Sequence, residues 1–183
     1  MFYAMTGAKF SGKDTVARAI INELALRGDT AEKVSFAGPL KEALCVMFGW
    51  TYEQIENHEF KEMPEPITGK TPRTIMQLLG TEFGRETLHP ELWLRIALST
   101  MRKMECNGIV PIITDVRFEN EAEFVRSHGG TLIHVVNPET VSRTDAHASE
   151  NGVAFVEGDI LFTNDKTAGL QPIMDFAARL IRP

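Results

Sequence analysis

The stretch GAKFSGKDT, residues 7–15, constrains the fold of this chain more than any other feature. It has the spacing of a phosphate-binding loop, with Gly7 followed five residues later by Gly12 and then by Lys13. The apolar run FYAMT at 2–6 precedes it, and apolar residues at helical spacing follow it. A glycine loop between a strand and a helix directs backbone N–H groups toward a phosphate. The segment therefore predicts a nucleotide site on a strand-loop-helix unit.

Asp14 departs from the usual motif, which has a hydroxyl residue after the lysine. Neighbouring residues of a helix point about 100° apart, so Thr15 cannot simply take over the position of Asp14. We therefore expect Asp14 to face a metal ion, because hard cations prefer oxygen ligands. The alternative is an acidic residue that only stabilises the first turn of the helix through its dipole.

Short apolar runs alternate with helical patterns along the rest of the chain. The expected strands cover residues 2–6, 33–37, 109–114, 131–136 and 159–164. The expected helices cover residues 14–27, 39–48, 72–85, 90–106, 119–128 and 168–181, whereas 50–71 are mainly loop and 137–158 are irregular. Strands that alternate with helices predict a parallel α/β sheet covered on both faces, with ligands at the carboxyl ends of the strands.

Asp115 ends the apolar run IVPIIT and is expected beside the phosphate site. A carboxylate at that place typically holds magnesium through water or orients an acceptor, and the alternative is an aspartate that caps a turn. Arg117 and Asn120 follow in DVRFENE and are expected at the same edge. The DxxG and NKxD motifs that a GTPase switch would need are both missing.

Polar side chains in TPRTIMQLLGTEFGR form a candidate acceptor site. Arg73 and Arg85 are twelve residues apart, just over three α-helical turns and roughly on one side, and Gln77 lies one turn after Arg73. Two guanidinium groups and an amide suit a monophosphate and a base edge, although solvated helix arginines are common. In SRTDAHASE, Arg143 is a candidate to close over a transferring phosphoryl group, and His147 is a structural or lid residue rather than a base.

The overall charge and hydropathy exclude other classes of protein. The formal net charge is −6 and no basic run is present, which argues against a nucleic-acid-binding protein. No apolar run approaches the roughly 18 residues of a membrane span, and no secretory signal is recognised, so we expect a cytoplasmic protein. A length of 183 residues suits one domain.

Several of these motifs together resemble the bacteriophage deoxynucleoside monophosphate kinases. The resemblance is carried, in this order, by GAKFSGKDT, SFAGPLKEAL, TPRTIMQLLGTEFGR, DVRFENEAEF and HASENGVAF…DILFTND. It implies a P-loop nucleotide kinase fold, a five-stranded parallel sheet flanked by helices on both faces, in a single domain over 1–183. Mobile acceptor-binding and lid segments are expected at about 38–107 and 137–158. It also implies ATP as phosphoryl donor, magnesium, and a (deoxy)nucleoside 5′-monophosphate acceptor.

The resemblance also assigns roles to individual residues. The ATP-binding residues are expected to be Gly7, Lys9, Ser11, Gly12, Lys13, Asp14, Thr15 and, near the adenine, Asn164. The monophosphate-binding residues are expected to be Ser35, Phe36, Arg73, Gln77 and Arg85. The catalytic residues are expected to be Lys13, Asp115, Arg117 and Arg143, and the metal ligands Asp14 and Asp115.

Two alternatives to this function stay open from the sequence. Phosphomevalonate kinases share an SGKD loop, so a P-loop kinase of another small phosphorylated acceptor is the first. A non-catalytic nucleotide-dependent switch, which would bind ATP without acceptor-dependent ADP formation, is the second. The expected partners are ATP and (deoxy)nucleoside monophosphates, and neither nucleic acid nor a membrane is expected. We expect a monomer or a homodimer in the cytoplasm, which would be the cytoplasm of the host if the chain is of phage origin.

Overall fold

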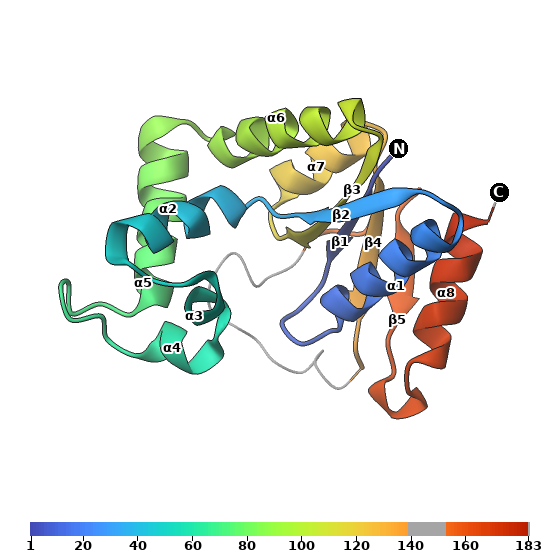
Figure 1. The fold of residues 1–183 in the computed structure, drawn as a ribbon, viewed down its shortest axis with the longest axis horizontal. Helices are drawn as coiled ribbons and strands as arrows, with labels where there is room; N and C mark the ends of the chain where they lie inside the picture. Colours follow the sequence, from blue (N-terminus) through green and yellow to red (C-terminus); the bar gives the residue numbers. More distant parts are fainter. Residues whose placement is uncertain (139–152, 183) are drawn as a thin grey trace. The chain divides into compact units, whose positions relative to one another are not determined.

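The computed structural model describes residues 1–138 and 153–182 (Figure 1). The chain divides into two compact units, one formed by Met1–Ser35 with Ser99–Pro183 and the other by Phe36–Leu98. Within the described residues, no helix is both long enough and apolar enough to cross a lipid bilayer.

The first unit is built on a five-stranded sheet whose neighbouring strands are all parallel. Its strands are β1 (Tyr3–Thr6), β2 (Thr30–Val34), β3 (Ile109–Val116), β4 (Thr131–Val136) and β5 (Ile160–Thr163). Their order in the sheet is β2-β3-β1-β4-β5, so β1 is central and leads directly into the glycine loop. The predicted five-stranded parallel sheet is confirmed, although β2 lies a few residues earlier than the predicted 33–37.

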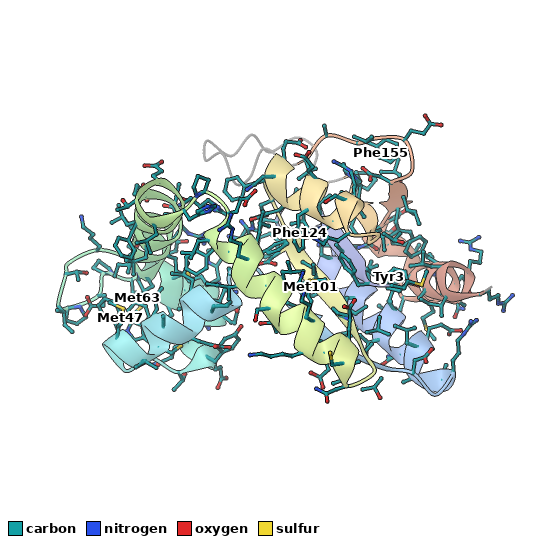
Figure 2. The ribbon with its side chains drawn as sticks, turned by 90° about the horizontal axis from the view of Figure 1, so that it is seen from above. Tyr3, Met47, Met63, Met101, Phe124 and Phe155 are labelled. Carbon is teal, nitrogen blue, oxygen red and sulfur yellow. The ribbon has the colours of Figure 1, made fainter. Side chains whose placement is uncertain are left out.

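Helices cover both faces of this sheet (Figure 1). The helices of the first unit are α1 (Lys13–Leu26), α7 (Glu119–Ser127), the short 3₁₀ helix η3 (Lys166–Ala168), α8 (Gln171–Ile181) and the end of α6 (Leu92–Cys106). Helices α1 and α8 bury their apolar faces in one cluster with Tyr3 and other strand residues. Phe124 on α7 is also buried but does not belong to this cluster (Figure 2). Such burial on both faces is typical of parallel sheets.

A buried ionic network fixes residues 153–159 to the sheet. The Asp159 carboxylate accepts hydrogen bonds from Arg126 Nε and Nη2 at 3.0 and 2.7 Å, and its Oδ2 lies 2.9 Å from His134 Nε2. Arg126 also donates to the backbone carbonyl of Ala154 at 2.9 Å. Burial raises the pKa of Asp159, but the hydrogen bonds from Arg126 and from the Val156 N–H outweigh it and lower the pKa to about 2.

Asp159→Asn is expected to destabilise the protein at neutral pH and to have little effect in acid. The depressed pKa of Asp159 adds roughly 2 kcal/mol to the free energy of unfolding at pH values above the usual pKa of 3.8. This contribution is lost as the pH falls from 3.8 through about 2. Urea unfolding of both proteins at pH 7 should therefore differ by about that amount, and the difference should shrink progressively below pH 4. A difference that stays constant down to pH 2 would assign the effect to packing instead.

The second unit is helical, and part of it corrects the sequence prediction. It contains α2 (Gly38–Phe48), α3 (Tyr52–Glu56), α4 (His58–Glu62), α5 (Pro72–Gln77), the π-helix η1 (Leu78–Leu88) and the start of α6. The prediction that 50–71 are mainly loop is wrong for α3 and α4. Thr51 and Gln54 form a reciprocal capping box, and Asn57 Oδ1 accepts the Phe60 N–H at 3.0 Å, so side-chain caps define both short helices.

The predicted α-helix over 72–85 changes geometry part way along. It is α-helical to Gln77 and continues as a π-helix to Leu88. Trp93 fixes this segment, because its indole N–H donates to the Gly80 carbonyl at 2.8 Å and its ring leaves no room for a Cβ at Gly84. The wider π turns mean that α-helical spacing no longer describes how residues before and after Leu78 align.

Candidate functional site

The glycine loop after β1 needs glycine at both ends. Gly7 has φ of 141° and Gly12 has φ of 102°, values that side chains rarely adopt. A Cβ at Gly7 would collide with the backbone carbonyl of Val135 on β4, and a Cβ at Gly12 would collide with the side-chain amide of Asn164. The loop therefore lies close against the ends of two neighbouring strands.

Lys13, the first residue of α1, folds its side chain over this loop. Its Nζ donates to the carbonyls of Gly7 and Ala8 at 2.6 and 2.8 Å. The ammonium therefore lies beside the loop whose shape suits a phosphate. Lys9, the other predicted phosphate-binding lysine, has its Nζ 5.0 Å from the centre of the Phe10 ring, and Phe10 has a positive φ of 65°.

Three hydroxyl groups near the carboxyl ends of the strands are buried without hydrogen-bond partners among residues 1–138 and 153–182. They belong to Thr6, Ser11 and Ser35. Thr6 ends β1, Ser11 lies in the loop, and Ser35 follows β2. A buried polar group left unpaired costs about 1–3 kcal/mol, and such groups require an explanation. Oxygen atoms of a ligand at this edge of the sheet would provide one. Thr6 is not among the predicted site residues, although a polar residue at the end of a buried strand is a signal for such a site.

Asn164, which follows β5, holds the loop through its side-chain amide. Its side-chain Nδ2 donates to the Ser11 carbonyl at 2.8 Å, and its backbone N–H donates to Val136 O at 2.7 Å. Asn164 is 4% exposed. The structure thus gives this residue a role in positioning the loop, and its expected place near the adenine stays a prediction.

Asp14 in the first turn of α1 forms an ion pair that the sequence does not predict. Its Oδ1 lies 2.7 Å from Lys33 Nζ on β2. Partial burial raises the pKa of Asp14, but the hydrogen bond and charge of Lys33 outweigh it and lower the pKa. The carboxylate is therefore ionised and well exposed, as a metal ligand would need to be. The neighbouring Thr15 is half-buried, and its N–H donates to Gly12 O at 3.0 Å.

Asp115 lies on β3 beside the central strand, at an irregularity of the sheet. In the pairing of β1 with β3, Ala4 matches Ile113 and Thr6 matches Val116, so β3 has one extra residue in this interval. Such a bulge alters the direction of the side chains next to it and is frequent beside active sites. Asp115 thus lies at the carboxyl edge of the sheet, as the sequence predicts.

Arg117 follows β3, and its backbone is fixed by a buried glutamate. The N–H groups of Arg117 and Phe118 both donate to Glu121 Oε2, at 2.7 and 3.1 Å. Glu121 is 1% exposed and defines the start of α7.

Among the residues that the structure describes, no group of three or more His, Cys, Asp or Glu side chains could hold a metal ion.

The predicted acceptor residues belong to both units. Ser35 ends the first segment of the sheet unit, whereas Phe36, which is 2% exposed, begins the helical unit. Arg73 on α5 pairs through Nε with Glu62 Oε1 of α4 at 2.6 Å. Gln77 ends α5, and Arg85 lies in the π-helix η1; both are half-buried. Arg143 and His147, with most of the predicted lid segment, lie outside the described residues.

Comparisons with known proteins identify relatives of this chain. Residues 51–171 match the family described as deoxynucleotide monophosphate kinase. A relative from Acanthamoeba polyphaga mimivirus is 36% identical, with 89% of this chain and 88% of that protein covered. The deoxynucleoside-5′-monophosphate kinase of Escherichia phage T5 is 38% identical over 80% of this chain and 82% of its own length. The deoxynucleotide monophosphate kinase of Enterobacteria phage T4 is 26% identical, over 88% and 91%.

A solved structure supports the same fold from an independent direction. The Mycobacterium tuberculosis APS kinase CysC in complex with AMPPNP and APS superimposes with a TM-score of 0.54 at 12% sequence identity. The match covers 98% of this chain and 95% of that chain. At such low identity the likeness concerns the fold alone, and it confirms the predicted P-loop kinase architecture.

Proposed function

Because this chain belongs to the deoxynucleotide monophosphate kinase family, we propose that it transfers the γ-phosphoryl group of ATP to a deoxynucleoside 5′-monophosphate. The products are ADP and a deoxynucleoside diphosphate, a precursor for DNA synthesis. The observation that carries the proposal is the glycine loop between β1 and α1, with Lys13 folded over it. The unpaired hydroxyls of Thr6 and Ser11 beside it support a phosphate ligand at this edge.

The residues of the loop bind and orient the donor in this proposal. The backbone N–H groups of the loop and of the first turn of α1 surround the phosphates, and Lys13 leaves the Gly7 and Ala8 carbonyls to contact the β- and γ-phosphates. Positioned positive charge of this kind provides most of the catalysis in phosphoryl transfer. Lys9 and Thr15 contribute further contacts to the phosphates.

Asp14 and Asp115 are the residues that would hold magnesium. Magnesium prefers oxygen ligands and is usually bound by one or two carboxylates together with substrate phosphates, so two aspartates at this edge fit it. When bound, the ion would supply positive charge that neutralises the negative charge developing on the phosphates during transfer.

The acceptor is held, in this proposal, by the helical unit and the residues that lead into it. Arg73 and Arg85 bind its phosphate, and Gln77 binds a base edge. Ser35 and Phe36 contribute to the same site. Arg117 and Arg143 flank the transferred group and stabilise its charge in the transition state.

A coupled assay of ADP formation tests the proposal directly. With ATP, magnesium and each of dGMP, dTMP, dCMP and dAMP in turn, we expect ADP formation that depends on at least one monophosphate. ATP binding without acceptor-dependent ADP would indicate a nucleotide-dependent switch. Turnover with phosphomevalonate but none of the four nucleotides would favour the other kinase class. We also expect a monomer or homodimer that acts in the cytoplasm.

Asp14→Asn is expected to raise the magnesium concentration needed for half-maximal rate several-fold, because an amide is a weaker ligand than a carboxylate. Asp14→Ser should be milder, since a hydroxyl is the usual ligand at this position. Magnesium titrations beside melting curves of the three proteins provide the measurement. If Asp14 only stabilises the helix start, both variants should lose about 0.3–1 kcal/mol of stability and keep the magnesium midpoint of the wild type.

A further inference from the structure

Three cations of the helical unit gather around two carboxylates. Lys41 Nζ on α2 lies 2.6 Å from Glu56 Oε1, at the end of α3. Lys61 Nζ on α4 lies 3.6 Å from Glu56 Oε2 and 3.4 Å from the Glu56 carbonyl oxygen. Arg73 on α5 pairs with Glu62 of α4. Helices that are separate in the sequence thus bring their positive charges to one place.

The cations of this cluster are more buried than the carboxylates. The side chains of Lys41, Lys61 and Arg73 are 18%, 17% and 32% exposed, whereas those of Glu56 and Glu62 are 44% and 46% exposed. The low exposure of the cations reflects in part the burial of their aliphatic stems. Their three charges outnumber the two carboxylates of the cluster, and an uncompensated, partly buried charge is costly. A site that exchanges its carboxylates for a more highly charged anion explains this excess.

The electrostatics of Lys61 show that the charges act on one another. Burial lowers the pKa of the Lys61 ammonium, the Glu56 carboxylate raises it, and the charge of Lys41 lowers it again. The guanidinium of Arg73 acts in the same direction as Lys41, and the net result is a lowered pKa. Mutual repulsion of this kind is relieved by a bound anion that contacts all the cations.

The donors of this cluster are only partly used. In the described part of the chain, the Arg73 side chain has one hydrogen bond, from Nε to Glu62, which leaves its terminal amino groups as donors. The Lys41 ammonium donates only to Glu56 among these residues. A carboxylate is an oxyanion, so Glu62 on Arg73 occupies a place that a phosphate oxygen can take.

We propose that Lys41, Lys61 and Arg73 together bind the 5′-phosphate of the acceptor, and that Glu56 and Glu62 occupy its place in the ligand-free protein. The proposal rests on the proposed function and adds Lys41 and Lys61 to the acceptor site. A nucleotide phosphate carries a charge of about −1.5 to −2 at pH 7, which matches a site of three cations better than one carboxylate does. Two ammonium groups and a planar guanidinium supply donors in several directions.

The test compares the affinities of three ligands by calorimetry on the full chain. The ligands are the best-bound of dGMP, dTMP, dCMP and dAMP, its nucleoside without phosphate, and a non-hydrolysable ATP analogue. Lys41→Met and Lys61→Met should each weaken the monophosphate about tenfold or more, the size of a lost charge-assisted contact. Binding of the nucleoside and of the ATP analogue should stay within about twofold of the wild type. Lys70→Met, at an exposed lysine of the same unit, is the matched control and should change none of them.

Glu62→Gln should change the affinity for the monophosphate in the opposite direction to the lysine variants. The substitution should leave the fold intact, because the Glu62 side chain is half-exposed. Because Glu62 competes with the phosphate for Arg73, its neutralisation should tighten monophosphate binding several-fold. A structural ion pair instead predicts unchanged or weaker binding. The proposal is overturned if Lys41→Met and Lys61→Met match Lys70→Met, or if Glu62→Gln weakens the monophosphate. If the wild-type protein binds none of the four monophosphates, the proposed function itself is contradicted. If the wild-type protein binds and phosphorylates a monophosphate, and Lys41→Met and Lys61→Met bind it equally well, only this phosphate site is contradicted.

Discussion

Lys13→Ala lowers turnover by at least about a hundred- to a thousandfold while the protein stays folded; this is the largest effect that we expect. Loss of one positioned donor to a developing negative charge has this size in enzymes generally, and phosphoryl transfer depends mainly on such charges. The fold should survive because Lys13 is half-buried at the start of α1 and the core of the sheet unit is built from other residues.

The measurement is the rate of acceptor-dependent ADP formation, with circular dichroism and a melting curve on the same preparation. Lys103→Ala, at an exposed lysine of α6, is the control for removal of one positive charge and should keep full activity. Full activity of a folded Lys13→Ala protein would contradict the kinase proposal. An unfolded variant would instead show that Lys13 is needed for the loop structure.

Arg73→Ala is expected to weaken binding of the acceptor far more than binding of ATP. A lost charge-assisted contact to phosphate costs roughly 1.5–3 kcal/mol, which corresponds to about a ten- to a hundredfold change in affinity. The ion pair with Glu62 is also lost, but it is partly exposed and contributes little to stability. The affinity for the monophosphate should therefore fall without a large change in melting temperature.

Calorimetric titration of each ligand separately provides the measurement for Arg73. Arg95→Ala removes an arginine from a similar pair, 3.2 Å from Glu91 and exposed on α6, and should leave both affinities unchanged. Equal weakening of ATP and monophosphate by Arg73→Ala would show that Arg73 does not belong to the acceptor site.

The sequence predicts the sheet unit well because its signals are local. The apolar run before Gly7 and the helical spacing after Lys13 define β1, the loop and α1 without any knowledge of distant residues. The alternation of strands and helices then leads to a five-stranded parallel sheet, whereas the order of the strands comes from the structure. Asp115 is placed correctly at the sheet edge for the same reason.

The features that the sequence does not predict depend on distant partners. Lys33 lies nineteen positions from Asp14, and nothing in the chain between them indicates that they pair. The π-helix depends on Trp93, whose indole N–H reaches back thirteen positions to Gly80. Two helices of five residues each are too short for periodicity, so only the caps at Thr51 and Asn57 could have indicated them.

The contact between Asn164 and the glycine loop has a consequence for how this protein is made. The loop is synthesised early relative to its partner, because its Ser11 carbonyl and the packing at Gly12 depend on an amide more than 150 positions later. Strand β1 likewise pairs with β3 and β4, which are synthesised long after it. A nascent chain therefore carries the complete nucleotide motif before it contains the amide that holds the loop in shape. Since a ligand stabilises only the molecules that can bind it, we expect ATP to stabilise chains that extend past Asn164 more than chains that end before it.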